Sequence, residues 1–193
     1  MSQIQLPKLR RIDPAKPKKK KIFLITDDIK FFSGVATVAK ELVLGTIDKY
    51  DYCQLAAAMN HPDHGKRIDV SAEVAKETGV SDSYLIQYCH NGYGNPSVIR
   101  EIIGYEKPDL ILLITDPRFF THIWQMEHEL KTKWKIPVAY LNIWDNLPYP
   151  LWNAAAYASC DLLMSINRQT KVINKEVLNW HGTEWIDLDT QQN

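Results

Sequence analysis

The stretch Asp109-Leu110-Ile111-Leu112-Leu113-Ile114-Thr115-Asp116-Pro117-Arg118 decides the fold of this chain. A continuous apolar run of this length predicts a strand that is buried on both faces, as in a parallel sheet. Pro117 suits the first position of a helix, so a polar loop is expected between the strand and that helix. Open α/β sheets bind ligands at the carboxyl ends of their strands, which makes Asp116 a candidate binding residue.

Apolar runs and amphipathic segments alternate along the rest of the chain. Other strands are expected at residues 22–26, 52–57, 84–89, 137–143 and 161–166, with the stretch above as the fourth strand in sequence order. Helices are expected at residues 35–43, 72–77, 97–105, 119–134, 151–158 and 168–178. Gly45 is expected to end the first helix, and residues 60–70 are expected to form a loop.

This alternation predicts an α/β fold: a doubly wound, mostly parallel, Rossmann-like sheet with helices on both faces. Right-handed crossovers favour the strand order 3-2-1-4-5-6, counted along the chain. In that order the first and fourth strands are neighbours. The loop after the first strand, with Asp27, Asp28, Ser33 and Gly34, should then face Asp116 and Arg118.

The 193 residues fit one domain with two tails: a basic flexible tail at 1–20, the Rossmann-like domain at 21–180, and a C-terminal tail or linker remnant at 181–193. The net charge of zero gives no support for nucleic-acid binding. Basic residues crowd the N-terminus, however, and such a run can touch anionic lipid or RNA. A solvated tail is the favoured interpretation. The basic residues are Lys8, Arg10, Arg11, Lys16 and Lys18 to Lys21.

The three cysteines, Cys53, Cys89 and Cys160, are odd in number and lack a Cys-x-x-Cys spacing, which favours a reducing compartment. No apolar run reaches membrane-spanning length, and no apolar stretch follows the basic N-terminus. We therefore expect a cytoplasmic protein without a signal peptide. The basic N-terminus is the candidate for any peripheral contact with a membrane.

Common catalytic motifs are missing. Phe31-Phe32-Ser33-Gly34-Val35 carries a single glycine, which disfavours a dinucleotide-binding enzyme and a P-loop NTPase. Gly34 either permits a close ligand approach or simply permits a tight turn, and both alternatives stay open. The Asp27-Asp28 pair lies too far from Asp116 for a phosphate-accepting receiver domain. His61 and His64 have no further ligands near them in sequence, so we expect no metal site.

Two later loops carry groups suited to a ligand. The segment Trp144-Asp145-Asn146-Leu147-Pro148-Tyr149-Pro150 combines aromatic faces with paired hydrogen-bonding groups, and a ligand contact is favoured over a purely structural plug. In the next loop, Asn167 is a plausible helix N-cap and Arg168 could reach a phosphate.

Four segments together resemble a known family. They are the turn Ser33-Gly34-Val35, Lys107-Pro108-Asp109 before a strand ending in Asp116-Pro117, Asn142-Ile143-Trp144-Asp145, and the stretch from Cys160 to Thr170. In order and spacing they resemble the N-terminal, acceptor-side half of a two-domain GT-B glycosyltransferase, in the retaining group called glycosyl transferase family 4. The likeness covers roughly residues 21–180.

The resemblance implies a hexosyltransferase that takes a sugar from a nucleotide-sugar, with no further cofactor, to a glycan or lipid-linked acceptor. Ser33 and Gly34 would lie beside the donor diphosphate. Asp116 and Asp145, the candidate catalytic residues, would orient sugar or acceptor hydroxyls together with Asn146. Trp144 would contact the sugar, and Arg168 would contact a phosphate. Trp144 stands where that family often has a histidine that touches the sugar, so the resemblance does not imply the histidine's own contact in this chain.

The donor-binding second domain, with its Glu-x7-Glu motif, does not follow in this chain. A single domain cannot enclose the donor or exclude water from the reacting centre. We therefore expect the isolated chain to be weak or inactive, acting with a partner chain that carries the donor domain unless it is itself a fragment. The rival hypothesis is a non-catalytic Rossmann-like module that binds a nucleotide or a protein partner.

Overall fold

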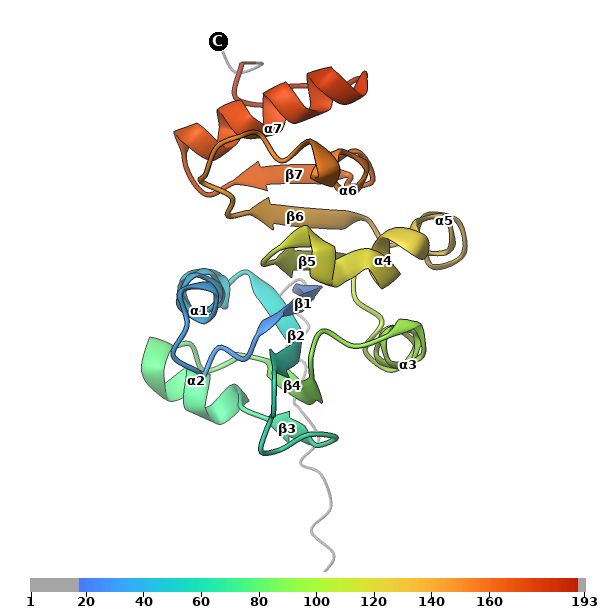
Figure 1. The fold of residues 1–193 in the computed structure, drawn as a ribbon. Helices are drawn as coiled ribbons and strands as arrows, with labels where there is room; N and C mark the ends of the chain where they lie inside the picture. Colours follow the sequence, from blue (N-terminus) through green and yellow to red (C-terminus); the bar gives the residue numbers. More distant parts are fainter. Residues whose placement is uncertain (1–17, 191–193) are drawn as a thin grey trace, which may run out of the picture.

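The computed structural model describes residues 18–190. In this part of the chain, seven strands form one sheet in the order β3-β4-β2-β1-β5-β6-β7 (Figure 1). Neighbouring strands are parallel, except that β3 is antiparallel to β4. The parallel strands stand in the predicted order, so the doubly wound α/β fold is confirmed. The strands are β1 Lys20–Asp27, β2 Tyr50–Ala58, β3 Arg67–Asp69, β4 Leu85–Asn91, β5 Leu110–Ile114, β6 Val138–Asn142 and β7 Leu162–Ser165.

Helices connect the parallel strands and lie on both faces of the sheet, with α1 and α2 on one side and α3, α4 and α5 on the other (Figure 1). The helices are α1 Gly34–Thr46, α2 Ser71–Thr78, α3 Pro96–Glu106, α4 Thr121–Gln125, α5 Glu127–Glu129, α6 Ala154–Ala158 and α7 Arg168–His181. Short 3-10 turns cover Pro117–Phe120 and Leu151–Asn153, and a π-helical turn covers Leu130–Trp134.

Polar side chains fix the start of three helices. The Ser33 hydroxyl accepts the amide N–H of Ala36, and the Asn95 side chain accepts two N–H groups in front of α3. Asn167 accepts the N–H of Thr170, so the predicted N-cap of the last helix is confirmed. These bonds satisfy N–H groups that have no partner inside the helix.

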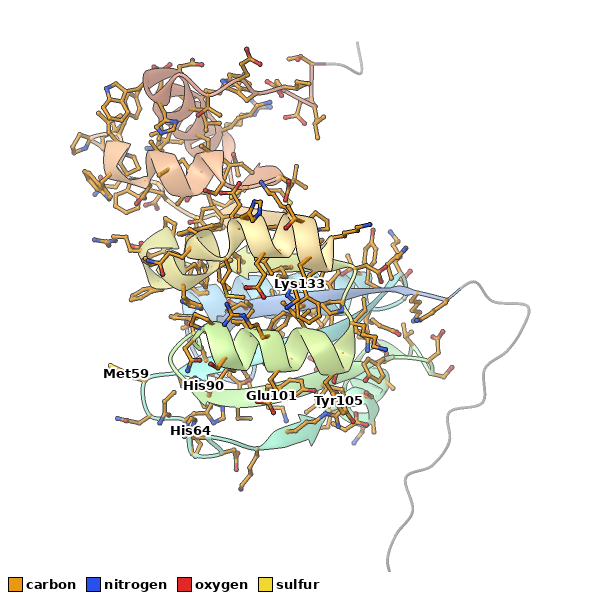
Figure 2. The ribbon with its side chains drawn as sticks, turned by 90° about the vertical axis from the view of Figure 1, so that its right-hand side faces the viewer. Met59, His64, His90, Glu101, Tyr105 and Lys133 are labelled. Carbon is orange, nitrogen blue, oxygen red and sulfur yellow. The ribbon has the colours of Figure 1, made fainter. Side chains whose placement is uncertain are left out.

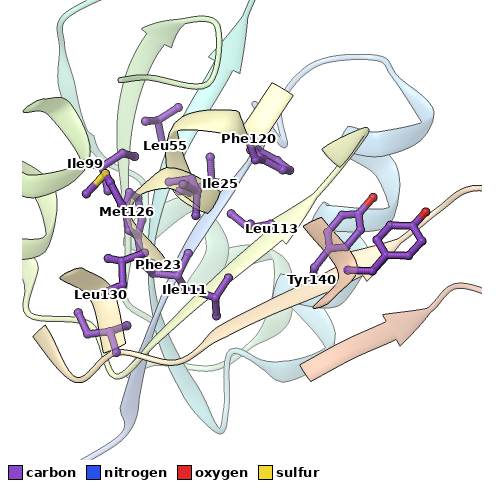
Figure 3. Close-up of a cluster of buried hydrophobic side chains, with 14 of the residues drawn as sticks. Phe23, Ile25, Leu55, Ile99, Ile111, Leu113, Phe120, Met126, Leu130 and Tyr140 are labelled. Carbon is purple, nitrogen blue, oxygen red and sulfur yellow. The ribbon is translucent and has the colours of Figure 1, made fainter. Parts of the chain in front are cut away.

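The core has two layers because successive side chains of a strand point to opposite faces. Phe23, Ile25, Ile111 and Leu113 face the α3 side, where Figure 3 shows them packed with helical side chains such as Met126. The intervening residues pack against α1 and α2 on the other side. Burial on both faces explains why the strands consist of nearly continuous apolar runs.

On the α1 side, the β5–β7 half of the sheet has less cover. Among the residues that the structure describes, the helical side chains of this core layer come from α1 and α2. A groove of about 610 Å³ lies there, with Leu42 and Thr46 of α1 on one wall and Leu162 and Met164 of β7 on the other. Leu162 is 39% exposed. The groove leaves apolar sheet surface open to solvent.

Two expectations about the first half of the domain are wrong. Residues 60–70 are not all loop, because β3 pairs with the edge of β4 through a three-residue ladder too short to leave a sequence pattern. Gly45 does not end the first helix, which continues to Thr46. The fully buried Ile47 follows directly, and its burial favours extending the helix across the glycine.

The expected helix at 119–134 is also wrong as a single element. The segment changes from a 3-10 turn to α-helix and then to a π-helical turn. Ile123, Met126 and Leu130 of its apolar stripe are buried as predicted, whereas Phe119 is 55% exposed. The 3-10 turn after Pro117 rotates Phe119 out of the stripe, since its residues per turn differ from those of an α-helix.

The ends of the domain differ slightly from the expected boundaries. β1 begins at Lys20, and the Lys19 ammonium donates to the carbonyl of Ile47 at 2.8 Å. The remainder of the predicted basic tail, residues 1–17, lies outside the described residues. At the other end, α7 continues to His181, and Asp187 beyond it forms ion pairs with Lys171 and Lys175.

A buried carboxylate ties the amino-terminal side of the sheet together. Glu106, only 5% exposed, accepts hydrogen bonds from Lys21 at 2.8 Å, Arg67 at 3.2 Å and Tyr88 at 2.6 Å. Burial alone would raise the pKa of Glu106, but the bonds from Lys21 and Tyr88 and the nearby cations lower it below its usual value. The carboxylate therefore links β1, β3, β4 and α3.

We expect Glu106→Gln to lower the free energy of unfolding at pH 7 by about 2 kcal/mol, because the partly buried Lys21 and the exposed Arg67 lose their hydrogen bonds to a charged, buried acceptor. Since the pKa of Glu106 is lower in the folded state, its contribution is present above the unfolded pKa of about 4.3 and is lost as the pH falls through the folded pKa. Urea unfolding followed by circular dichroism from pH 7 to pH 3 tests this.

The matched control is Glu77→Gln, which breaks the exposed pair with Lys40 and should change stability by less than about 0.5 kcal/mol. A difference between the wild type and Glu106→Gln that stays constant across the pH range would contradict the role of the charge.

Candidate functional site

The predicted site residues lie at one rim of the sheet. Ser33 and Gly34 follow β1, Asp116 follows β5, and Trp144 to Asn146 follow β6. β1, β5 and β6 are consecutive parallel neighbours, so their carboxyl ends share one rim. Arg168 starts the helix after β7 and is on the same rim.

The turn after β1 is organised by Asp27, whose side chain is half-buried. The Ser33 hydroxyl donates to Asp27 Oδ2 at 2.7 Å while it caps α1. The Tyr93 hydroxyl donates to Asp27 Oδ1. Gly34 has no left-handed backbone angle, and a Cβ there would meet nothing within 4 Å. The tight turn therefore does not require a glycine. Of the two alternatives for Gly34, only the close approach of a ligand would require one.

Asp28, the next residue, belongs to a buried polar network. His61 Nε2 lies 3.0 Å from Asp28 Oδ2, and the Gln87 amide donates to Oδ1 at 2.7 Å and to Gln54 at 2.9 Å. The amide of Asp63 donates to His61 Nδ1, so Nε2 carries the proton that bonds Asp28. The Asp28 carboxylate also accepts the N–H of Lys30. The network holds the β1 turn rigidly over the ends of β2 and β4.

Tyr93 and the end of β5 form the middle of the rim. Burial and the bond to Asp27 raise the pKa of Tyr93, which therefore stays protonated as a donor. Its ring stacks on exposed Phe119 with centroids 5.2 Å apart. Thr115, the residue after β5, has φ of 144°, which a β-branched residue rarely adopts. Strained backbone of this kind clusters at binding and catalytic sites.

Asp116 is held by Arg118 through the guanidinium and the backbone N–H of that residue. Burial would raise the pKa of Asp116, but these hydrogen bonds lower it below its usual value. The carboxylate is therefore charged at neutral pH and already paired. Asp116 and Arg118 were both expected to face a ligand across the rim, and in the structure they form an ion pair with each other.

The β6 loop is fixed through its backbone. The Thr170 hydroxyl donates to the carbonyl of Trp144 at 2.8 Å, and the Gln169 side chain donates to the carbonyl of Asp145 at 2.8 Å. The Trp144 indole N–H donates to the carbonyl of Asn146. The carboxylate of Asp145 is exposed and has no hydrogen bond or ion pair within residues 18–190, which leaves it free for a ligand.

The two groups of rim residues are joined below the surface. The Tyr140 hydroxyl donates to the carbonyl of Thr115 at 2.7 Å and lies 3.3 Å from Asn142 Oδ1, which accepts the N–H of Trp144. The Thr115 carbonyl, the Tyr140 hydroxyl and Asn142 thus join the end of β5 to the β6 loop, while Asp27 and Tyr93 are bonded to each other at the end of β1. Arg168 has no such link: it is exposed, and within the described chain it makes no hydrogen bond or ion pair.

Sequence reasoning missed Tyr93 and Phe119, and assigned His61 to a solvated loop, although it is 6% exposed and bonded to Asp28. The turn of residues 91–96 carried a usable signal, since it follows a strand and so had to lie at the same rim. Residues 18–190 contain no group of three or more His, Cys, Asp or Glu side chains placed to hold a metal ion.

Comparisons with known proteins leave the resemblance to family 4 as a hypothesis. No protein-family model matches this chain, and no curated protein sequence matches it. Among the helices of the described part, none has the length and apolar character needed to cross a bilayer. Function is therefore inferred from the motifs and from the geometry of the rim.

We expect His61→Ala to lower the free energy of unfolding by about 2 kcal/mol, because it leaves the buried Asp28 carboxylate short of a donor. It should also shift the NMR resonances of residues 28–33, whose turn depends on Asp28. His128→Ala is the control: the His128 side chain is exposed and forms no hydrogen bond or ion pair within residues 18–190, so its loss should cost less than about 0.5 kcal/mol. Equal effects of the two substitutions would show that the network does not hold the turn.

Proposed function

We propose that this chain is the acceptor-side domain of a GT-B glycosyltransferase similar to glycosyl transferase family 4. It would help transfer a hexose from a nucleotide-sugar to a glycan or lipid-linked acceptor. The observation that supports this most is that three of the resembling segments meet at one rim: the turns after β1, β5 and β6. In a wound sheet this rim is the usual ligand site.

The states of the rim side chains suggest separate roles. Asp145 is exposed and unpaired among the described residues, so it is the best-placed carboxylate to accept hydrogen bonds from sugar hydroxyls. Asp116 is already paired with Arg118 and would act by position rather than as a base. Arg168, whose side chain has no ion pair among the described residues, could approach a donor phosphate, and Asn146 and Trp144 flank Asp145. The placement of Ser33 and Gly34 beside the diphosphate stays a prediction.

The proposed mechanism relies on position. A retaining transfer demands little general-base help, so orientation of the two sugars and stabilisation of the diphosphate leaving group would dominate. A second domain, on a partner chain if need be, would close over the donor and exclude water. The isolated chain would therefore turn over slowly.

The rival function is a Rossmann-like module that binds a nucleotide or a protein without catalysis. The pairing of Asp116 with Arg118 favours it, because one of the two expected carboxylates is already neutralised. Single-turnover assays separate the two functions. With the purified chain in excess over a panel of radiolabelled nucleotide-sugars, hydrolysis or transfer supports the glycosyltransferase, and binding without turnover supports the rival.

For the nucleotide-sugar that is turned over, Asp145→Ala should reduce the single-turnover rate about tenfold or more, the cost of losing hydrogen bonds to a charged group. The fold should persist, since the side chain is exposed, and circular dichroism and thermal unfolding should match the wild type. The control is Asp48→Ala, an exposed carboxylate before β2 on the opposite rim, which should leave the rate unchanged. Equal rates for all three proteins would remove Asp145 from the site.

A further inference from the structure

The strongest unassigned feature of the rim is the cluster of Asp27, Tyr93, Ser33 and Phe119. The two carboxylate oxygens of Asp27 accept from the hydroxyls of Ser33 and Tyr93, and in the described residues it has no cationic partner. The Phe119 ring extends the Tyr93 ring outward, with centroids 5.2 Å apart and an interplanar angle of 28°. A carboxylate held by hydroxyls thus lies beside an exposed aromatic face.

The charges around this cluster decide what it can bind. The neighbouring carboxylate Asp116 has its own cation in Arg118, and the nearby Lys30 pairs with Glu73. Within residues 18–190 no unpaired cation lies beside Ser33, whose hydroxyl is 2.7 Å from the Asp27 carboxylate. A phosphate bonded to this hydroxyl would come close to the carboxylate, and two like charges that are close together repel each other. The start of α1 is therefore a poor place for a diphosphate.

An uncharged sugar meets none of this repulsion. Its hydroxyl groups can donate to Asp27 in the way that Ser33 and Tyr93 already do, with the added strength of a charged acceptor. Its apolar ring face can lie on Phe119, whose side chain is 55% exposed. The strained backbone at Thr115, which lies at the same rim, is a further sign of a binding site there.

We infer that Asp27, Tyr93 and Phe119 form the subsite for an uncharged saccharide acceptor, with Ser33 on the acceptor side rather than beside the donor diphosphate. This inference rests on the proposed function and names its acceptor class: a neutral sugar, as opposed to a phosphorylated or uronic one. Asp27 binds a hydroxyl, Phe119 supports the ring, and Tyr93 positions both.

Binding to the full chain is measured by amide NMR with two sets of probes. The neutral set is glucose, galactose, mannose and N-acetylglucosamine, and the anionic set is glucuronic acid, glucose 1-phosphate and UDP. We expect a neutral sugar to shift the amides of Ser33, Gly34, Thr115 and Phe119. Asp27→Asn and Phe119→Ala should each weaken that binding about tenfold or more.

The control is Tyr105→Ala. Tyr105 is 69% exposed and lies at the far end of α3, away from the rim marked by Met59 and His90 (Figure 2), so binding should stay within about twofold of the wild type. Phe119→Ala alters an exposed side chain and keeps the test valid even when Asp27→Asn disturbs the fold.

Three results would overturn the inference. The first is that UDP or glucose 1-phosphate shifts the Ser33 and Gly34 amides while neutral sugars do not. The second is that binding of the neutral sugar is insensitive to both substitutions. The third is that none of the probes binds at the rim. The turnover of nucleotide-sugars is measured separately, so the glycosyltransferase proposal stands or fails on that assay and the acceptor subsite on this one.

Discussion

The rim of this domain depends on a row of hydrogen bonds beneath it. At the end of β1 Tyr93 bonds Asp27, and at the ends of β5 and β6 the Tyr140 hydroxyl lies between the carbonyl of Thr115 and Asn142. Asn142, fully buried, also donates to Tyr157 and so ties β6 to α6. Buried polar groups stabilise a structure only when each finds its partner, so these side chains must keep their relative positions. The loops that follow β1, β5 and β6 are therefore held rigidly as well.

A rigid rim suits binding by preorganisation. Within the described part of the chain, Asp145 can stay exposed and unpaired because Gln169 and Thr170 fix the backbone around it. There too, the Asp27 carboxylate can stay without a cation because two hydroxyls bond it. Both groups meet a ligand with little loss of conformational entropy. Rigidity also explains how the left-handed angle at Thr115 persists: its carbonyl is bonded by Tyr140, which over-determines the conformation.

The sheet order and the placement of Ser33, Asp116 and Asp145 at one rim could be predicted from sequence, because apolar runs define strands and crossovers have one handedness. The partners of these residues could not. Tyr93 is 66 positions from Asp27, and His61 is 33 positions from Asp28. Such pairs depend on side-chain packing rather than on periodicity. β3 could not be predicted either, because a strand of three residues at a polar edge is too short for an alternating pattern that distinguishes it from a loop.

The groove between α1 and β7 has a practical consequence for experiments on the folded chain. We expect fluorescent dyes that report exposed apolar surface to bind this groove in the native protein, because leucine and methionine side chains line it. A dye-based melting curve would then start from a high signal and show a shallow transition. Native dye fluorescence from this domain is therefore no sign of a molten state, and backbone spectroscopy is the sounder measure of its folding.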